Sequence, residues 1–190
     1  SCIAIVGETG KGKTTLIRLL LALATPQEGQ ILLIPAKHPL ETSHTVSPQT
    51  RKNFVYVPQG NTLFSGTIRD NLLMGNPQAS QEAIYQALQT ATADFVFHLP
   101  DGVDSPLSER GGGLSEGQAQ RIAIARGLLC AGRILLLDEF SSALDADTEH
   151  LLMERLTAHA AGKTLIFITH RPEICLLYTS DAADDRISVD

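Results

Sequence analysis

The chain has 190 residues, of which 43% are apolar and 19% are charged, a balance that excludes a disordered or collagen-like chain and suits one globular domain. The net charge of -6 argues against a nucleic-acid-binding protein that works by neutralising phosphates. The longest apolar run, residues 19–24, is too short to cross a bilayer. Three cysteines without a CxxC pair predict reduced thiols rather than a disulfide framework or a metal site.

Short apolar runs alternate with helical patterns along the chain, which predicts an α/β fold with a mainly parallel sheet. The predicted strands, rich in Ile, Leu and Val, are residues 2–6, 31–34, 54–57, 133–137 and 164–169. The predicted helices are residues 13–23, 67–73, 81–90, 116–128 and 147–160. Ser80 and Ser115 stand where N-caps belong. Residues 35–53 contain three prolines and predict a variable loop or a short hairpin.

The first motif lies between a predicted strand and a predicted helix, where residues 7–14 fit the pattern G-x-x-x-x-G-K-[ST]. Its glycines let successive N–H groups face one concavity, and the following helix directs its positive N-terminus to the same place. Lys13 adds a charge for the β- and γ-phosphates, and the Thr14 hydroxyl can bind Mg²⁺. The predicted nucleotide-binding residues are Gly7, Glu8, Thr9, Gly10, Lys11, Gly12, Lys13, Thr14 and Thr15.

The second motif is an apolar run that ends in Asp138 and Glu139. It brings two carboxylates to the C-terminal edge of a parallel sheet, where ligands bind in open α/β folds. Asp138 suits the shell of a Mg²⁺ ion, usually through water, and Glu139 suits a general base for an attacking water. An acidic pair alone is more often a solvated strand end, but together with the phosphate-binding motif it predicts nucleotide hydrolysis.

The third motif connects the chain to a family, because residues 114–118, Leu-Ser-Glu-Gly-Gln, resemble the LSGGQ signature of ATP-binding-cassette (ABC) ATPases. Glu116 stands where that family commonly has glycine. Gln59 resembles the family's Q-loop glutamine, residues 142–145 resemble its D-loop, and His170 resembles its switch histidine. The resemblance covers residues 3–173. It implies a P-loop NTPase with a RecA-like parallel-sheet core and an inserted α-helical subdomain, roughly residues 65–128.

The resemblance also implies a set of roles. The chain would bind and hydrolyse ATP with Mg²⁺, with Glu139, His170 and Gln59 as catalytic residues and with Thr14, Gln59 and Asp138 holding the metal. Two cassettes of this family sandwich two nucleotides in a head-to-tail dimer, and whether the second cassette is identical stays open. The residues that would serve the partner's nucleotide or the dimer interface are Leu114, Ser115, Glu116, Gly117, Gln118 and Asp145. Glu116 is tolerable there only if its side chain points away from the phosphates.

Residues 63–72, Leu-Phe-Ser-Gly-Thr-Ile-Arg-Asp-Asn-Leu, resemble exporter-type cassettes, in which this surface receives the coupling helices of a membrane domain. We therefore expect a transmembrane domain to contact the surface between Gln59 and Leu72, with Leu63 and Phe64 exposed in an apolar docking groove. Those two side chains could instead form a local core patch under a loop. The exporter resemblance implies a motor for substrate translocation at the cytoplasmic face of a bacterial inner membrane, without a nucleic-acid partner.

Two other functions stay open from the sequence: a soluble ABC ATPase of DNA repair, chromosome organisation or translation, and a regulatory cassette that binds ATP without turnover. The stretch between Lys13 and Ser115 has no heptads for the coiled coil of repair ATPases, and translation-associated members carry two cassettes. The presence of Lys13, Asp138, Glu139 and His170 argues against a regulatory cassette. Phe140, where the family usually has alanine, is expected to alter the packing near the D-loop.

Both ends of the chain suggest a piece of a longer protein. Cassettes of the family have strands and an adenine-stacking aromatic residue before the phosphate-binding motif, and they continue well beyond the switch histidine. We expect residues 1–174 to be a partial cassette. Residues 175–190 do not resemble the family and look like the translation of a sequencing adapter, so we expect them to be a non-native tail.

Overall fold

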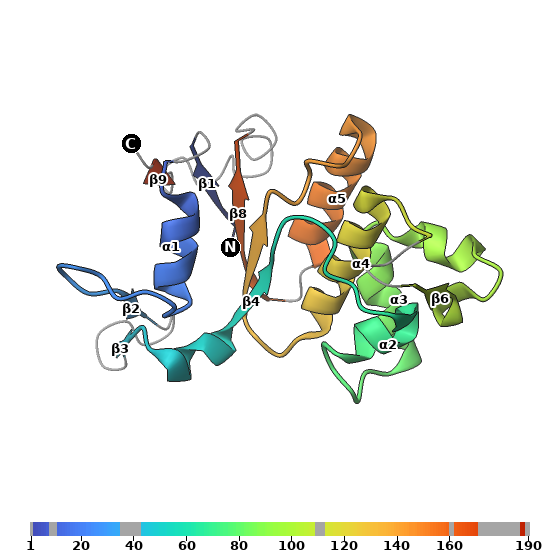
Figure 1. Ribbon diagram of the computed structural model, residues 1–190, viewed down its shortest axis with the longest axis horizontal. Coiled ribbons are helices and arrows are strands. Elements are labelled where there is room, and N and C mark those ends of the chain that lie inside the picture. Colours follow the sequence, from blue (N-terminus) through green and yellow to red (C-terminus); the bar gives the residue numbers. More distant parts are fainter. Residues whose placement is uncertain are drawn as a thin grey trace.

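The structure is a computed structural model, and it describes residues 2–7, 11–34, 43–108, 113–159, 162–170 and 187–188. A five-stranded sheet in the order β4-β7-β8-β1-β9 forms its centre, and every neighbouring pair is parallel. The strands are β1 (Cys2–Val6), β4 (Phe54–Val57), β7 (Ile134–Asp138), β8 (Thr164–Thr169) and β9 (Ile187–Ser188). Figure 1 shows the sheet between α1 (Lys13–Leu20) on one side and α4 (Glu116–Leu129) and α5 (Ala146–His159) on the other.

The central strand β7 explains why the sheet is covered on both faces. Leu135, Leu136 and Leu137 are all fully buried, as a continuous apolar run requires of a strand without a solvent face. Alternate side chains point to opposite faces. Leu135 and Leu137 therefore join the larger core under α4 and α5, whereas Leu136 joins a smaller core with Ile17 of α1.

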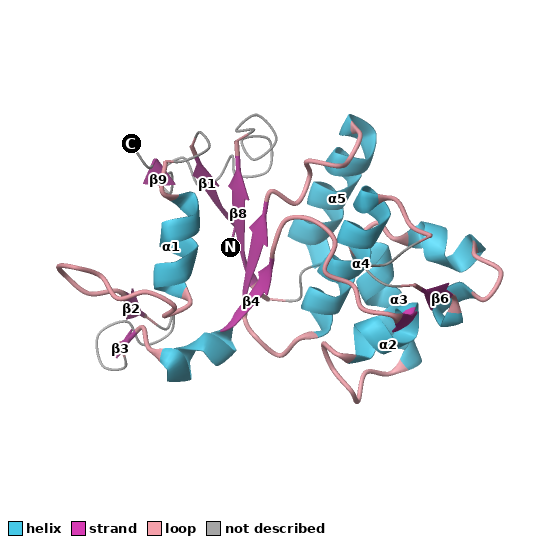
Figure 2. Cartoon of the chain, in the orientation of Figure 1, coloured by secondary structure: helices cyan, strands magenta, loops and turns pink. Residues whose placement is uncertain are grey.

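The other helices form a layer beyond α4, visible at the right of Figure 2. α4 packs against α2 (Ile68–Leu73) and α3 (Gln81–Thr90) as well as against β4 and β7. Short elements complete the fold: the ladders β2 (Leu32–Leu33) with β3 (His44–Thr45) and β5 (Gly66–Thr67) with β6 (Pro106–Leu107), and the 3₁₀ turns η1 (Pro48–Asn53), η2 (Asp94–His98) and η3 (Gly102–Asp104). None of the helices in the described part of the chain has both the length and the apolar character needed to cross a membrane.

The predicted elements agree closely with the structure where the local pattern is strong. The predictions for β1, β4, β8 and α3 have the observed bounds. Both predicted N-caps are confirmed, since the Ser80 hydroxyl accepts from the Ala83 N–H and the Ser115 hydroxyl accepts from the Gln118 N–H. Residues 35–53 are predicted to form a variable loop or a short hairpin. Within this range β3 pairs antiparallel with β2, which precedes the range, and residues 35–42 lie outside the described residues.

The bounds predicted for α2, α4, α5 and β7 are off by one residue, and two further predicted elements differ for a structural reason. The predicted helix 13–23 ends at Leu20, because the N–H groups of Ala22 and Leu23 turn back to the carbonyls of Leu19 and Arg18. This is the Schellman arrangement, with Ala22 in the left-handed conformation (φ 51°) that glycine more often takes. The predicted strand 31–34 shortens to β2, which pairs outside the parallel sheet.

The last described residues extend the sheet. The backbone of β9 pairs with Ile5 and Val6 of β1, although residues 175–190 as a whole were expected to be a non-native tail. The other residues of that stretch lie outside the described residues, so the origin of the tail stays a prediction.

Candidate nucleotide-binding site

The N-terminus of α1 forms the first part of the site. Gly12 caps the helix with φ 89° and without a side-chain cap, so the first N–H groups of the helix remain available for an anion. Lys13 is buried, and its ammonium group donates a hydrogen bond to the carbonyl of Gly7 at the end of β1. Thr14 is exposed in the first turn. The predicted site residues Lys11 and Thr15 are also exposed, whereas Glu8, Thr9 and Gly10 lie outside the described residues.

Glu139 is the point where three distant parts of the chain meet. Its Oε1 lies 3.6 Å from Lys13 Nζ, and its Oε2 lies 2.6 Å from His170 Nδ1. The backbone of Glu139 has φ 46°, a left-handed conformation that is uncommon for residues other than glycine, and its N–H donates to the carbonyl of Ile168. The ends of β7 and β8 thereby place the carboxylate between the cation of α1 and the imidazole that follows β8.

The neighbouring carboxylate has a different partner. Asp138 Oδ2 accepts a 2.9 Å hydrogen bond from the hydroxyl of Tyr56 on β4. Burial raises the pKa of Asp138, the hydrogen bond from Tyr56 opposes this rise, and the charge of Glu139 adds to it. Burial, with the hydrogen bond to Asp138, also raises the pKa of Tyr56 well above its usual value. Tyr56 was missed at the level of sequence, where only the predicted pairing of neighbouring strands could have indicated it.

Gln59 follows β4 after one intervening residue, Pro58, at the same edge of the sheet as the two carboxylates, and its side chain is exposed. The loop that carries it is attached to α4 at two points. Gln120 donates to the carbonyl of Pro58, and Arg126 donates to the carbonyl and hydroxyl oxygens of Thr62. The position of Gln59 therefore depends on the position of α4.

The signature lies at the start of α4, on the opposite side of the sheet from α1 (Figure 1). Ser115 and Gln118 form a reciprocal capping box, and Glu116 is exposed. Gly117 is buried, and a Cβ at this position would lie 2.6 Å from the carbonyl oxygen of Ala143. The signature and the D-loop of one chain are therefore in direct contact, whereas Leu114 is only partly buried against the core.

Asp145 completes the D-loop and caps α5. Its carboxylate accepts from the backbone N–H and the hydroxyl of Thr148, at 2.9 and 2.8 Å. These hydrogen bonds hold the pKa of Asp145 below its ordinary value. The Asp145 side chain is exposed. It can therefore contact another molecule at the surface where the D-loop and the signature lie together.

The expectation that Leu63 and Phe64 are both exposed in an apolar docking groove is only half correct. Leu63 is 4% exposed and belongs to the larger core, as the alternative interpretation held. Its N–H donates to Asn61 Oδ1, and the turn directs the side chain inward. Phe64 is 57% exposed, with the guanidinium of Arg126 5.9 Å from the centre of its ring.

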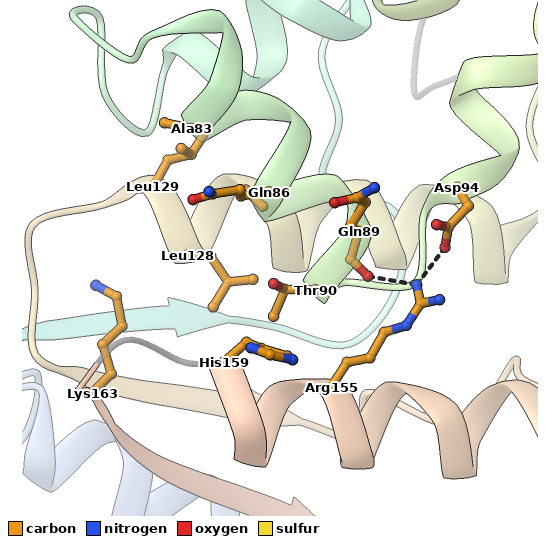
Figure 3. Close-up of a pocket in the computed structure, with 11 residues that line it drawn as sticks. Ala83, Gln86, Gln89, Thr90, Asp94, Leu128, Leu129, Arg155, His159 and Lys163 are labelled. Carbon is orange, nitrogen blue, oxygen red and sulfur yellow. Dashed lines mark hydrogen bonds and ion pairs between the residues drawn. The ribbon is translucent and has the colours of Figure 1, made fainter.

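A separate cavity of about 600 Å³ lies between α3, α5 and the end of α4 (Figure 3). Arg155 crosses its rim from α5 and donates to the carboxylate of Asp94 and the carbonyl of Gln89. The lining residues are Ala83, Gln86, Ala87, Gln89, Thr90, Asp94, Leu128, Leu129, Arg155, His159 and Lys163. None of the predicted site residues is among them, so this cavity is distinct from the predicted nucleotide site.

The donor set suits a magnesium ion shared with phosphates. Thr14, Gln59 and Asp138 offer hydroxyl, amide and carboxylate oxygens, the hard ligands that Mg²⁺ prefers. Within the described ranges, no three His, Cys, Asp or Glu side chains gather into a metal cluster. The three oxygen donors fit an ion that a bound nucleotide would also help to hold, as is common for Mg²⁺.

Comparison with known proteins points to one family. Residues 1–142 match the family model described as "ABC transporter". A "Putative export ATP-binding/permease protein" of Rickettsia felis is 44% identical over 174 residues, covering 89% of this chain and 29% of its own length. The "Toxin RTX-III translocation ATP-binding protein" of Actinobacillus pleuropneumoniae is 40% identical over 170 residues, covering 89% of this chain and 23% of its own length.

A solved structure agrees with these relatives. "Structure of a bacterial Atm1-family ABC exporter with ATP bound" superposes with a TM-score of 0.79 at 38% identity, covering 98% of this chain and 31% of that one. The chain thus spans less than a third of the length of each of these proteins.

Proposed function

The chain belongs to the ABC transporter family as an ATP-binding cassette of the exporter type, and we propose that it hydrolyses ATP to power the movement of a substrate through a transmembrane domain. The observation that carries this proposal is the convergence of Lys13 and His170 on Glu139. An ammonium group, a carboxylate and an imidazole thus lie together at the carboxyl edge of one parallel sheet, where nucleotides bind in this class of fold, and this supports the proposed roles.

Each side chain has a task that its surroundings support. The first turn of α1 and Lys13 hold the phosphates, Glu139 accepts the proton of the attacking water, and His170 orients that carboxylate and reaches the γ-phosphate. Thr14, Asp138 and Gln59 would hold the Mg²⁺. When bound, this ion neutralises charge on the β- and γ-phosphates.

The second half of each site comes from another cassette. α4 starts on the side of the sheet opposite α1, so the N-terminus of its signature serves a nucleotide held by a partner. Ser115 and Gly117 then face the partner's γ-phosphate, and Asp145 lies at the interface because the D-loop touches Gly117.

The exporter relatives support a membrane partner and a position at the cytoplasmic face of a membrane, for which we propose the bacterial inner membrane. Phe64 provides an exposed aromatic ring between Gln59 and Leu72 for that contact. We further propose that residues 65–128 act as a helical subdomain, that residues 1–174 are part of a longer cassette, and that residues 175–190 are not native to it.

Glu139→Gln in the full-length protein tests the proposal. The amide keeps the size of the side chain but cannot accept the proton, so turnover falls by about 10²–10⁴-fold while ATP stays bound and a dimer accumulates. ATP hydrolysis, retained nucleotide and the dimer fraction in gel filtration are the measurements. Glu154→Gln, at an exposed position on α5, is the matched control. Normal ATP turnover by the Glu139→Gln variant would show that Glu139 is not the general base.

A further inference from the structure

The hydroxyl of Tyr56 connects two neighbouring strands at the catalytic edge of the sheet. β4 and β7 run parallel, and the register pairs Tyr56 with Leu136, two residues before Asp138. Alternate residues of a strand share a face, so Tyr56 and Asp138 lie diagonally on the same side. The hydroxyl donates to Asp138 Oδ2 at 2.9 Å.

The two adjacent carboxylates are held in different ways. Glu139 has one oxygen near a lysine ammonium and the other near an imidazole. Asp138 receives a hydrogen bond from a neutral phenol. A carboxylate has about four acceptor positions and a single hydroxyl fills one of them, so Asp138 keeps acceptor capacity for a metal or a water while its rotation is restrained.

The aromatic ring restricts where the hydroxyl oxygen of Tyr56 can lie. Tyr56 is 37% exposed, and its body is anchored in β4, which is hydrogen-bonded along its whole length to β7. A phenol has only two side-chain torsions. The position of its oxygen therefore follows directly from the backbone of the strand, which a long flexible side chain could not ensure.

We propose that Tyr56 is a positioning residue that orients the Asp138 carboxylate for Mg²⁺ in the nucleotide site. The inference rests on the proposed function, because it needs Asp138 to hold the ion that accompanies ATP. Hydrogen bonds from such outer residues orient metal ligands in other proteins, and their loss typically lowers metal affinity or activity by about 10–100-fold.

Tyr56→Phe in the full-length protein tests this directly, since it removes the hydroxyl and keeps the ring. The measurements are the affinity for a fluorescent ATP analogue in EDTA, and the concentration of Mg²⁺ that gives its half-maximal effect on that affinity. We expect the apparent Mg²⁺ affinity to fall by about tenfold, with the affinity in EDTA and the thermal midpoint of the nucleotide-free protein unchanged. Binding of Mn²⁺ in the presence of the analogue, followed by electron paramagnetic resonance, reports the same change without turnover.

Two comparisons separate positioning from a structural effect. Tyr85→Phe removes a hydroxyl from the exposed face of α3 and should leave every value unchanged. In an Asp138→Asn background, Tyr56→Phe should cause no further loss of Mg²⁺ affinity, because the oriented carboxylate is already gone.

The outcomes also separate this inference from the proposed function. An unchanged Mg²⁺ affinity in Tyr56→Phe, or an equal loss of affinity in EDTA, would overturn the role of Tyr56 while wild-type ATP binding stands. A wild-type protein that binds no nucleotide at all would overturn both.

Discussion

Gly117 lies directly against Ala143, where a Cβ would stand 2.6 Å from the carbonyl oxygen and 3.0 Å from a methyl group of Leu144. The first turn of the signature helix and the D-loop of the same chain therefore fit together with no room for a side chain. The signature and the D-loop, which both contact the partner in the proposed dimer, are thus packed tightly against each other within each cassette.

This contact predicts that Gly117→Ala is destabilising. The added methyl group meets backbone rather than a flexible side chain, so α4 or the D-loop must shift, at a cost of about 1–3 kcal/mol in the free energy of unfolding. Urea unfolding followed by circular dichroism measures it. Glu116 is the exposed neighbour of Gly117, and Glu116→Gln serves as the control. It should change the free energy of unfolding by less than about 1 kcal/mol. Equal stabilities for Gly117→Ala and wild type would show that the contact is not tight.

We expect the Asp145 carboxylate to make a pH-dependent contribution to the stability of the fold. Its pKa is lowered in the folded state by the hydrogen bonds from Thr148, so folding favours the charged form. The stabilisation is present above the pKa of the unfolded chain and is lost as the pH falls through the lower pKa of the folded state. Asp145→Asn should therefore lower the melting temperature near pH 7, and its difference from wild type should shrink as the pH drops below about 4.

Asp147→Asn is the matched control for Asp145, because Asp147 is also exposed in the first turn of α5. Melting temperatures of the three proteins from pH 3 to pH 8 give the comparison. A difference between Asp145→Asn and wild type that stays constant over this range would assign the effect to shape rather than to charge.

Arg155 links α5 to the layer of α3 and η2 at the rim of the cavity in Figure 3. Both partners of its ion pair are partly exposed, so we expect Arg155→Met to cost only about 1 kcal/mol. The coupling with Asp94→Asn in a double-mutant cycle isolates the pair. Arg133→Met, at an exposed position before β7, is the control. A coupling energy near zero would mean that the pair does not hold the layers together.

Phe140, the residue after Glu139, lies in the hydrophobic core. It is 2% exposed, and its ring lies 5.1 Å from that of Phe167 on β8. Phe140→Ala, which introduces the residue usual in the family, should leave a cavity and cost about 3–5 kcal/mol in this chain. Chemical denaturation provides the measurement, with exposed Phe64→Ala as the control. A loss below about 1 kcal/mol would show that the surrounding core collapses into the space.

Much of this protein could be predicted from local pattern. Ser80 before an amphipathic run identified α3 to the residue, because a cap and a 3.6-residue period act within a few positions of the chain. The glycines and Lys13 predict a phosphate site for a similarly local reason, since one tight turn followed by a helix is enough to form such a site. The acidic end of β7 predicts that catalytic residues lie at the carboxyl ends of the strands, because parallel strands end at the same edge of the sheet.

Other features could not be predicted from the types of the neighbouring residues. Ala22 ends α1 without the glycine that usually signals such a stop, and Leu63 turns into the core through a hydrogen bond with Asn61. The partner of Asp138 is Tyr56, which only the register of β4 against β7 reveals. Short-range propensity determined which elements form and which chemistry they carry. Strand order and packing decided which side chains meet. Contacts across a sheet depend on how distant segments of the chain pack together, and the residues next to each contact in the sequence do not indicate them.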